Sequence, residues 1–117
     1  MKRFAADVPP EERHRIREGE GRALLRPYLR KGEMAGVDFV SLVTLDPGAS
    51  IGRHPHPAEE EFYLVLEGRG QATLDGEAFP VGPGDAFLCR AGHSHGLRNT
   101  GEGPLTFMAV LAPAPHS

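Results

Sequence analysis

Short apolar segments separated by turn-forming residues follow one another from residue 37 to near the end of the chain. They are rich in β-branched and aromatic side chains, which favour strands. The 15 glycines and 11 prolines are spread between the segments, which predicts many turns rather than a disordered tract. The predicted strands are residues 37–45, 61–68, 70–75, 77–81, 86–90, 96–99 and 105–112. This rhythm predicts an all-β sandwich or barrel, and 117 residues suit a single core.

One turn is specified by its residues. Asp75-Gly76 lies between two of the predicted strands, and a type I′ hairpin turn needs a positive φ angle at both of its central positions, which this pair adopts readily. Residues 70–75 and 77–81 are therefore predicted to pair as antiparallel neighbours.

The first 35 residues differ from the rest and are expected to form an N-terminal arm ahead of a β-barrel domain at 36–113. Residues 9–18 predict one or two helical turns that begin at proline. Residues 22–30 fit a helix or a strand, although Pro27 opposes a helix interior and confines a strand to an edge or a bulge. If they form an edge strand offered to a second chain, a homodimer results.

Charge and cysteine content limit the partners and the compartment. The net charge of −3 gives no reason to expect nucleic acid or an anionic membrane as partner. The single cysteine, Cys89, cannot form an intramolecular disulfide and is expected to be a small buried hydrophobic residue. No apolar run reaches the length of a signal peptide or a membrane span. A cytoplasmic protein is the expectation.

Two histidines stand one residue apart and each precedes a proline, in the stretch His54-Pro55-His56-Pro57. A residue before proline is driven toward extended backbone, and alternate residues of a strand face the same side. The two imidazoles can therefore converge on one ion at about 2.0–2.2 Å from each nitrogen. Pro55 removes a backbone donor, which suits a strand end. Two solvated loop histidines remain the alternative on this pair alone.

The wider spacing around the histidines resembles the first conserved motif of the cupin superfamily, G-x5-H-x-H-x3–4-E-x6-G. Gly48, His54, His56, Glu61 and Gly68 match its positions. Of three consecutive glutamates, the match selects Glu61, because only this one leaves six residues before Gly68.

A second stretch resembles the second cupin motif, G-x5-P-x-G-x2-H-x3-N. Gly84, Gly92, His95 and Asn99 fall on its fixed positions, and Arg90 stands where the motif has proline. The two motifs together cover residues 48–99.

The resemblance implies a cupin-type jelly-roll β-barrel with one divalent transition-metal ion held by His54, His56, Glu61 and His95. Imidazole and carboxylate ligands suit Mn, Fe, Co, Ni, Cu or Zn without selecting among them. Buried and unpartnered, such groups would each cost roughly 1–3 kcal/mol, a cost that a cation removes.

Other polar residues near the motifs have expected roles of their own. Tyr63 alternates with Glu61, so it should share the inward face, where it either packs or acts as a catalytic group toward a metal-bound substrate. His93 is expected to orient a ligand rather than bind the metal, and Asn99 is expected to brace the motif loop. Basic groups for an anionic ligand are expected from Arg90 or Arg98, which flank the second motif, and with less weight from Arg53, which should point away from the face that carries His54. The terminal histidines His14 and His116 are expected to be solvated.

The function that follows is a metal-dependent enzyme acting on a small oxygenated, carboxylate-bearing molecule, with chemistry similar to that of decarboxylase or dioxygenase cupins. Four protein ligands leave open positions on an octahedral ion, and three neutral imidazoles with one carboxylate leave a local charge of +1 on a divalent centre. The alternatives are a non-enzymatic cupin that binds a sugar or an organic acid, and a cupin isomerase or lyase.

Overall fold

The computed structural model describes residues 1–115, which form ten strands and two short 3₁₀ turns. The strands are β1 (Glu11–His14), β2 (Arg22–Leu29), β3 (Phe39–Leu45), β4 (Ser50–Pro55), β5 (Glu59–Glu67), β6 (Gly70–Leu74), β7 (Glu77–Val81), β8 (Ala86–Cys89), β9 (Ser94–Asn99) and β10 (Leu105–Pro113). The 3₁₀ turns are η1 (Ala5–Asp7) and η2 (Ile16–Glu18). Within residues 1–115, no helix is long and apolar enough to cross a membrane.

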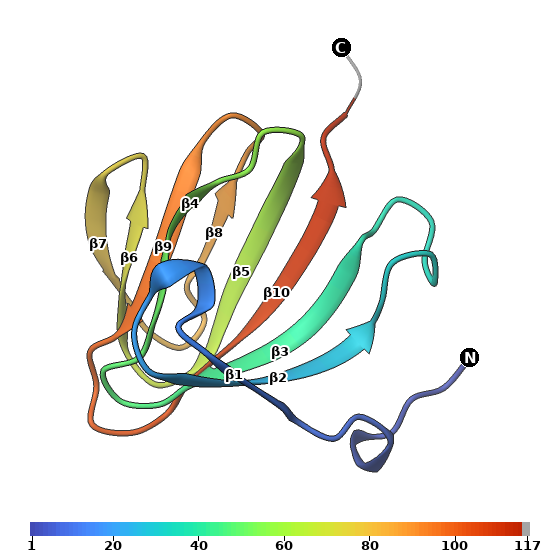
Figure 1. The fold of residues 1–117 in the computed structure, drawn as a ribbon, viewed down its shortest axis with the longest axis horizontal. Coiled ribbons are helices and arrows are strands. Elements are labelled where there is room, and N and C mark those ends of the chain that lie inside the picture. The colour runs from blue at the N-terminus through green and yellow to red at the C-terminus, as the bar shows by residue number, and fades with distance from the viewer. Residues whose placement is uncertain (116–117) are drawn as a thin grey trace.

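The strands form two antiparallel sheets that face each other (Figure 1). The larger sheet has the order β1-β2-β3-β10-β5-β8, and the smaller has the order β4-β9-β6-β7. The chain passes repeatedly between the two sheets, with β4 in the smaller one, β5 in the larger, the β6–β7 hairpin in the smaller, β8 in the larger, β9 in the smaller and β10 in the larger. This arrangement confirms the predicted all-β jelly-roll fold.

The hairpin predicted at Asp75-Gly76 is present between β6 and β7. Both residues have positive φ angles, 51° and 82°, as a type I′ turn requires. The strands pair in antiparallel register from Leu74 opposite Glu77 to Gly70 opposite Val81.

The N-terminal region departs from the helical prediction. Residues Glu11–His14 form β1, which pairs with Arg22–Leu25 of β2, and only the single turn η2 follows. Two interactions outweigh the weak local helix preference: the pairing of β1 with β2, and the ion pairs that Arg22 forms with Glu12 and Asp46. Tertiary context routinely overrides propensity in this way.

Strand β2 resolves the ambiguity of residues 22–30, and it lies inside the larger sheet, with β1 on one side and β3 on the other. Its pairing with β3 shifts register between Pro27 and Leu29, the irregularity that proline predicts in a strand. Residues 1–35 thus add two strands to the larger sheet.

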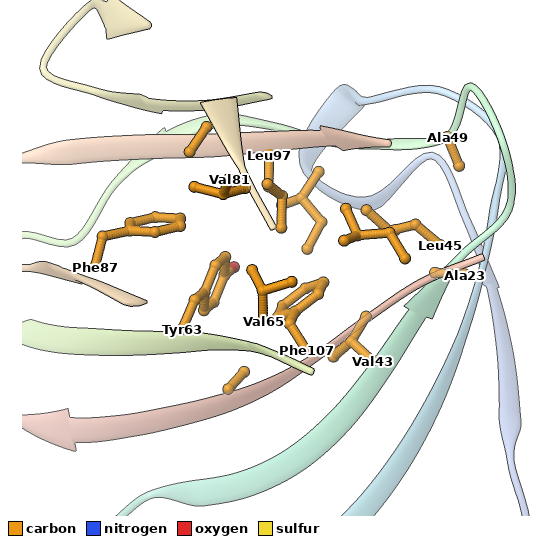
Figure 2. Packing of buried hydrophobic residues seen from close by; sticks show 14 residues of the cluster. Ala23, Val43, Leu45, Ala49, Tyr63, Val65, Val81, Phe87, Leu97 and Phe107 are labelled. Carbon is orange, nitrogen blue, oxygen red and sulfur yellow. The ribbon is translucent and has the colours of Figure 1, made fainter. Parts of the chain in front are cut away.

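The hydrophobic core fills the space between the sheets (Figure 2). Every second residue of β5 and β10 points inward, so Val65, Leu105 and Phe107 are fully buried. Each such side chain contributes about 1.5–3 kcal/mol through burial. On β5 the inward row runs from Val65 through Tyr63 to Glu61, so the same face changes from apolar core to polar site along one strand.

Candidate metal centre

Four polar side chains from both sheets meet at one point between them. His54 belongs to β4, His95 to β9 and Glu61 to β5, while His56 follows the end of β4. All four are buried, with exposed fractions of 7% for His54, 3% for His56, 5% for Glu61 and 1% for His95. The cluster therefore joins the smaller sheet to the larger one.

Strand pairing explains why these residues converge. His54 and His95 are direct cross-strand partners in β4 and β9. The backbone of His56 continues the contact beyond the strand end, because its N–H donates to the carbonyl of His93 at 3.1 Å and its carbonyl accepts from the N–H of Gly92 at 2.8 Å. The strand ends at Pro55, as its missing donor predicts, and His54 and His56 lie on the same inward side.

The distances within the cluster fit a single ion. The Nε2 atom of His95 lies 3.1 Å from Nε2 of His56 and 3.2 Å from Nε2 of His54. Oε1 of Glu61 lies 3.1 Å from Nε2 of His56 and 3.0 Å from Nε2 of His95. Ligand atoms about 2.1 Å from one ion lie about 3 Å apart when their bonds are at right angles. Nε2 of His54 is farther from Oε1 of Glu61, at 4.0 Å.

The tautomer of His54 is set by a backbone contact. Its Nδ1 atom lies 2.7 Å from the carbonyl oxygen of Gly52, which can only accept, so Nδ1 carries the hydrogen and Nε2 offers a lone pair to the cluster. Burial, as the main cause, lowers the pKa of His54 to about 4. The ring is therefore neutral at pH 7 and able to bind a metal ion.

The chemistry of the donor set also fits a cation. Three imidazole nitrogens and a carboxylate oxygen face one another in a buried space, and neutral imidazoles have too few hydrogens to satisfy all these contacts. A divalent ion at the centre would satisfy four acceptors together.

Tyr63 lies beside the cluster, as its alternation with Glu61 predicts. It is 3% exposed, and its ring packs on that of His95 with centroids 4.8 Å apart. Burial, followed by the nearby Glu61 carboxylate, raises the pKa of Tyr63 well above its ordinary value. The hydroxyl therefore keeps its proton at neutral pH and can donate a hydrogen bond.

A cavity of about 450 Å³ opens onto the cluster, within the roughly 300–1,000 Å³ typical of small-molecule sites. Its walls are mainly apolar and come from β2, β3 and β10, including Leu25, Phe39 and Leu111. Four exposed basic residues also line it, and we call them the cationic rim: Arg13, Arg17, Arg30 and Lys31. Three of the four candidate ligands line this cavity, so the cluster is reachable from outside through an apolar passage with a basic rim.

The histidines outside the motif positions do not join the cluster. The side chain of His93 is half exposed and pairs through Nδ1 with the carboxylate of Asp75. Asp75 also accepts from the N–H of Ser94 at 3.0 Å, so this contact ties the β6–β7 turn to the start of β9. His14 is exposed and contacts Glu12, and His116 lies outside the described residues.

Asn99 has the bracing role that was expected. Its side-chain nitrogen donates to the carbonyls of Leu45 and Gly103, and its oxygen accepts from the N–H of Gly101, each at 2.9 Å. It is 2% exposed. Cys89 is likewise buried, and burial raises the pKa of its thiol.

The predicted source of the basic groups was wrong. Arg53 and Arg98 line a separate depression on the opposite side of the smaller sheet together with Gln71, and Arg98 donates to the carbonyl of Gly48. Arg90 is exposed and does not line the cavity. Strand alternation turns Arg53 away from His54, as the sequence predicts, and it also separates Arg98 from His95.

The basic rim comes instead from the N-terminal region, for which the sequence predicts an arm ahead of the barrel. The available signal was the concentration of nine Lys and Arg residues in the first 35. This concentration of charge does not indicate which strand the region will pack against. Only the folded chain shows that these basic residues reach the cavity.

The two-sheet jelly roll with a buried three-histidine, one-glutamate cluster defines a cupin-type fold with a possible metal site. Residues 41–111 match the family model described as "Cupin domain", and the chain belongs to this family.

Two relatives and a solved structure resemble most of the chain. The "Oxalate-binding protein" of Thermotoga maritima is 32% identical over 108 residues, covering 92% of this chain and 89% of its own. "Polyketide synthase CurC" of Streptomyces cyaneus is 37% identical, covering 98% and 75%. The crystal structure of a predicted oxalate decarboxylase from Thermotoga maritima has a TM-score of 0.92 at 32% identity, covering 97% of this chain and 99% of that one.

Proposed function

We propose that this protein is a metal-dependent enzyme that acts on a small oxygenated molecule bearing a carboxylate. The observation that carries the proposal is the convergence of His54, His56, Glu61 and His95, the first three of which line an open cavity. A closed structural site has no need of such an approach, whereas a catalytic one keeps a position open for substrate. A bound divalent ion would supply Lewis acidity at that position.

The protein groups around the cluster suit an anionic ligand with an apolar body. The apolar walls would exclude water from a bound molecule and strengthen its polar contacts. The cationic rim supplies positive charge at the entrance, and the names of the Thermotoga relatives refer to oxalate. Decarboxylase-like or dioxygenase-like chemistry on such a ligand is the proposed activity.

Within the site, we assign Tyr63 the catalytic role of proton donor. Its hydroxyl is protonated at neutral pH, it lines the cavity, and it is held against His95 by ring packing. A group of this kind can donate a hydrogen bond to a developing negative charge on a substrate bound nearby, and it transfers the proton when that charge becomes more basic than the tyrosinate.

The first test measures metal content. Protein purified without chelator or a nickel column is expected to hold about one transition-metal ion per chain. Replacing His54 and His56 together with alanine should abolish that occupancy, and so should Glu61→Ala with His95→Ala. The matched control, His93→Ala, should leave it unchanged. Full metal occupancy in the double variant His54→Ala/His56→Ala would refute the metal site.

A second test separates an enzyme from a binding protein, the alternative supported by the name of the oxalate-binding relative. Oxalate and glycolate are titrated into metal-loaded protein by calorimetry, and their turnover is then followed with and without oxygen. If Tyr63 transfers a proton, Tyr63→Phe should lower the turnover rate far more than the affinity. Loss of affinity alone, or binding without turnover of any acid, would favour the non-enzymatic alternative.

A further inference from the structure

The four residues of the cationic rim differ in how far their charges are already neutralised. Arg13 and Arg30 both bind the carboxylate of Glu11, at 2.8 and 2.7 Å. The guanidinium of Arg17 makes no hydrogen bond or ion pair to any residue between 1 and 115. Arg17 therefore keeps its full charge and all its donors for a ligand.

Arg17 shares the wall of the cavity with the cluster. Its side chain lines the same cavity as His54, Glu61 and Tyr63. Lys31, the other rim residue without a partner within the described chain, lines the cavity as well, but it follows the end of β2. Arg17 is thus the free cation of the rim that belongs to η2, the turn in contact with the strand that carries His54.

The backbone around Arg17 is held in an unusual conformation. Arg15, Arg17 and Glu18 all have positive φ angles, of 52°, 52° and 63°. Non-glycine residues in this region cost about 1–3 kcal/mol each and persist only where the surroundings impose them. Hydrogen bonds from Glu18 N–H to the Arg15 carbonyl and from Gly19 N–H to the Ile16 carbonyl close the turn.

Two glycines allow this turn to lie directly on β4, as Figure 1 shows for η2. A Cβ atom on Gly52 would stand 2.0 Å from the carbonyl oxygen of Arg17, and one on Gly19 would stand 2.2 Å from that of Ser50. Ile16 packs against the core and anchors the turn from below. The position of Arg17 is therefore determined by close backbone contact with β4.

The same residue of β4 positions a metal ligand. The carbonyl of Gly52 accepts the hydrogen bond from Nδ1 of His54 at 2.7 Å, while its lack of a side chain admits the carbonyl of Arg17. Arg17 and His54 are thus held relative to each other through one residue, Gly52. A rigid separation between a cation and a metal site suits recognition of two linked anionic groups.

We propose that Arg17 is the specificity-determining residue of this site, and that its guanidinium binds the second carboxylate of a small dicarboxylate whose first carboxylate is at the metal centre. This inference rests on the proposed function. A metal centre of charge +1 together with Arg17 presents two positive charges to a ligand with two negative ones. Arginine offers paired N–H donors that match a carboxylate in geometry.

The test compares two ligands and three variants at fixed ionic strength. Oxalate carries two carboxylates, whereas glycolate can chelate a metal through its carboxylate and hydroxyl but carries only one. Both are titrated by calorimetry into wild-type protein loaded with Mn²⁺ and, separately, with Zn²⁺, and metal content is measured after each titration. The variants are Arg17→Gln, Arg17→Lys and Lys31→Gln, the last removing the same charge from another part of the rim.

Loss of a hydrogen bond to a charged group corresponds to about a 10- to 100-fold change in affinity. Arg17→Gln is expected to weaken oxalate binding by that factor and glycolate binding by less than threefold, with metal content unchanged. Arg17→Lys should recover part of the affinity, and Lys31→Gln, which removes one charge of the rim without removing a bound donor, should weaken oxalate and glycolate binding by less than threefold each. This pattern would support the assignment.

Failure of this inference can be told from failure of the proposed function. If loaded wild-type protein binds neither acid, the carboxylate ligand class is wrong and the role of Arg17 falls with it. If it binds oxalate, but Arg17→Gln binds equally well or loses oxalate and glycolate affinity to the same extent, only the inference about Arg17 is overturned. An equal loss in Lys31→Gln would also overturn it, because general rim charge would then account for binding.

Discussion

Acid should destabilise the metal-free protein through His54, and the substitution His54→Asn should remove that sensitivity. The pKa of His54 is lowered to about 4, mainly by burial, whereas an unfolded histidine has a pKa near 6.5. Below about pH 6.5 the unfolded chain therefore binds a proton that the folded chain does not. The contribution of neutral His54 to stability is present above that pH and is lost as the pH falls toward 4.

The expected magnitude follows from these two pKa values. Between pH 7.5 and pH 5, the difference in proton binding lowers the free energy of unfolding by about 2 kcal/mol. Asparagine does not titrate in this range, and its side-chain nitrogen can still donate to the carbonyl of Gly52 that His54 contacts. His54→Asn should thus keep the local hydrogen bond while flattening the pH dependence by that amount.

The assay is urea unfolding of chelator-treated protein at several pH values from 7.5 to 5, followed by circular dichroism. The control His14→Asn removes an exposed histidine outside the cavity and reports any general effect of losing one imidazole. If wild type and His54→Asn lose the same stability over this interval, then burial of a neutral His54 is not the cause of the acid sensitivity, and the reasoning is refuted.

Two further predictions concern stability and assembly. Asn99→Ala removes three hydrogen bonds of a buried side chain and should lower the free energy of unfolding by about 2–4 kcal/mol, as urea unfolding would show. A loss below about 0.5 kcal/mol would contradict a bracing role. We also expect a homodimer whose interface is the outer face of the larger sheet. On this face Met108 lies between Leu42 and Leu64, and Leu66 is 48% exposed. Light scattering should show Met108→Glu as a monomer with its metal content unchanged, and a monomeric wild type at micromolar concentration would disprove the dimer.

Much of the fold and of the candidate site could be predicted from local sequence. The hairpin at Asp75-Gly76 follows from the φ angles that these two residues adopt at little cost. The inward direction of His54, His56, Glu61 and Tyr63 follows from strand alternation and from the prolines that extend the backbone. Such features depend on residues close in sequence, so they can be predicted without knowing which strands pair with each other.

The N-terminal region shows where local reasoning stops. Residues 11–14 carry a weak helical preference, yet they form a strand because β2 supplies a pairing edge. Strand β2 was ambiguous for the same reason, since an apolar run with one proline does not say which strand it will pair with. Pairing over long sequence distances is decided by register and burial in the complete sheet.

The charge around the candidate site was decided by the tertiary structure alone. Arg53 stands next to His54 in sequence but faces the other side of the smaller sheet, while Arg17 stands 37 positions away and lines the cavity. The sequence by itself determined the ligand spacing, the alternation and the turns. Which cation faces the metal ligands depended on the contact of η2 with β4, because that contact requires Gly19 and Gly52 to meet across the fold.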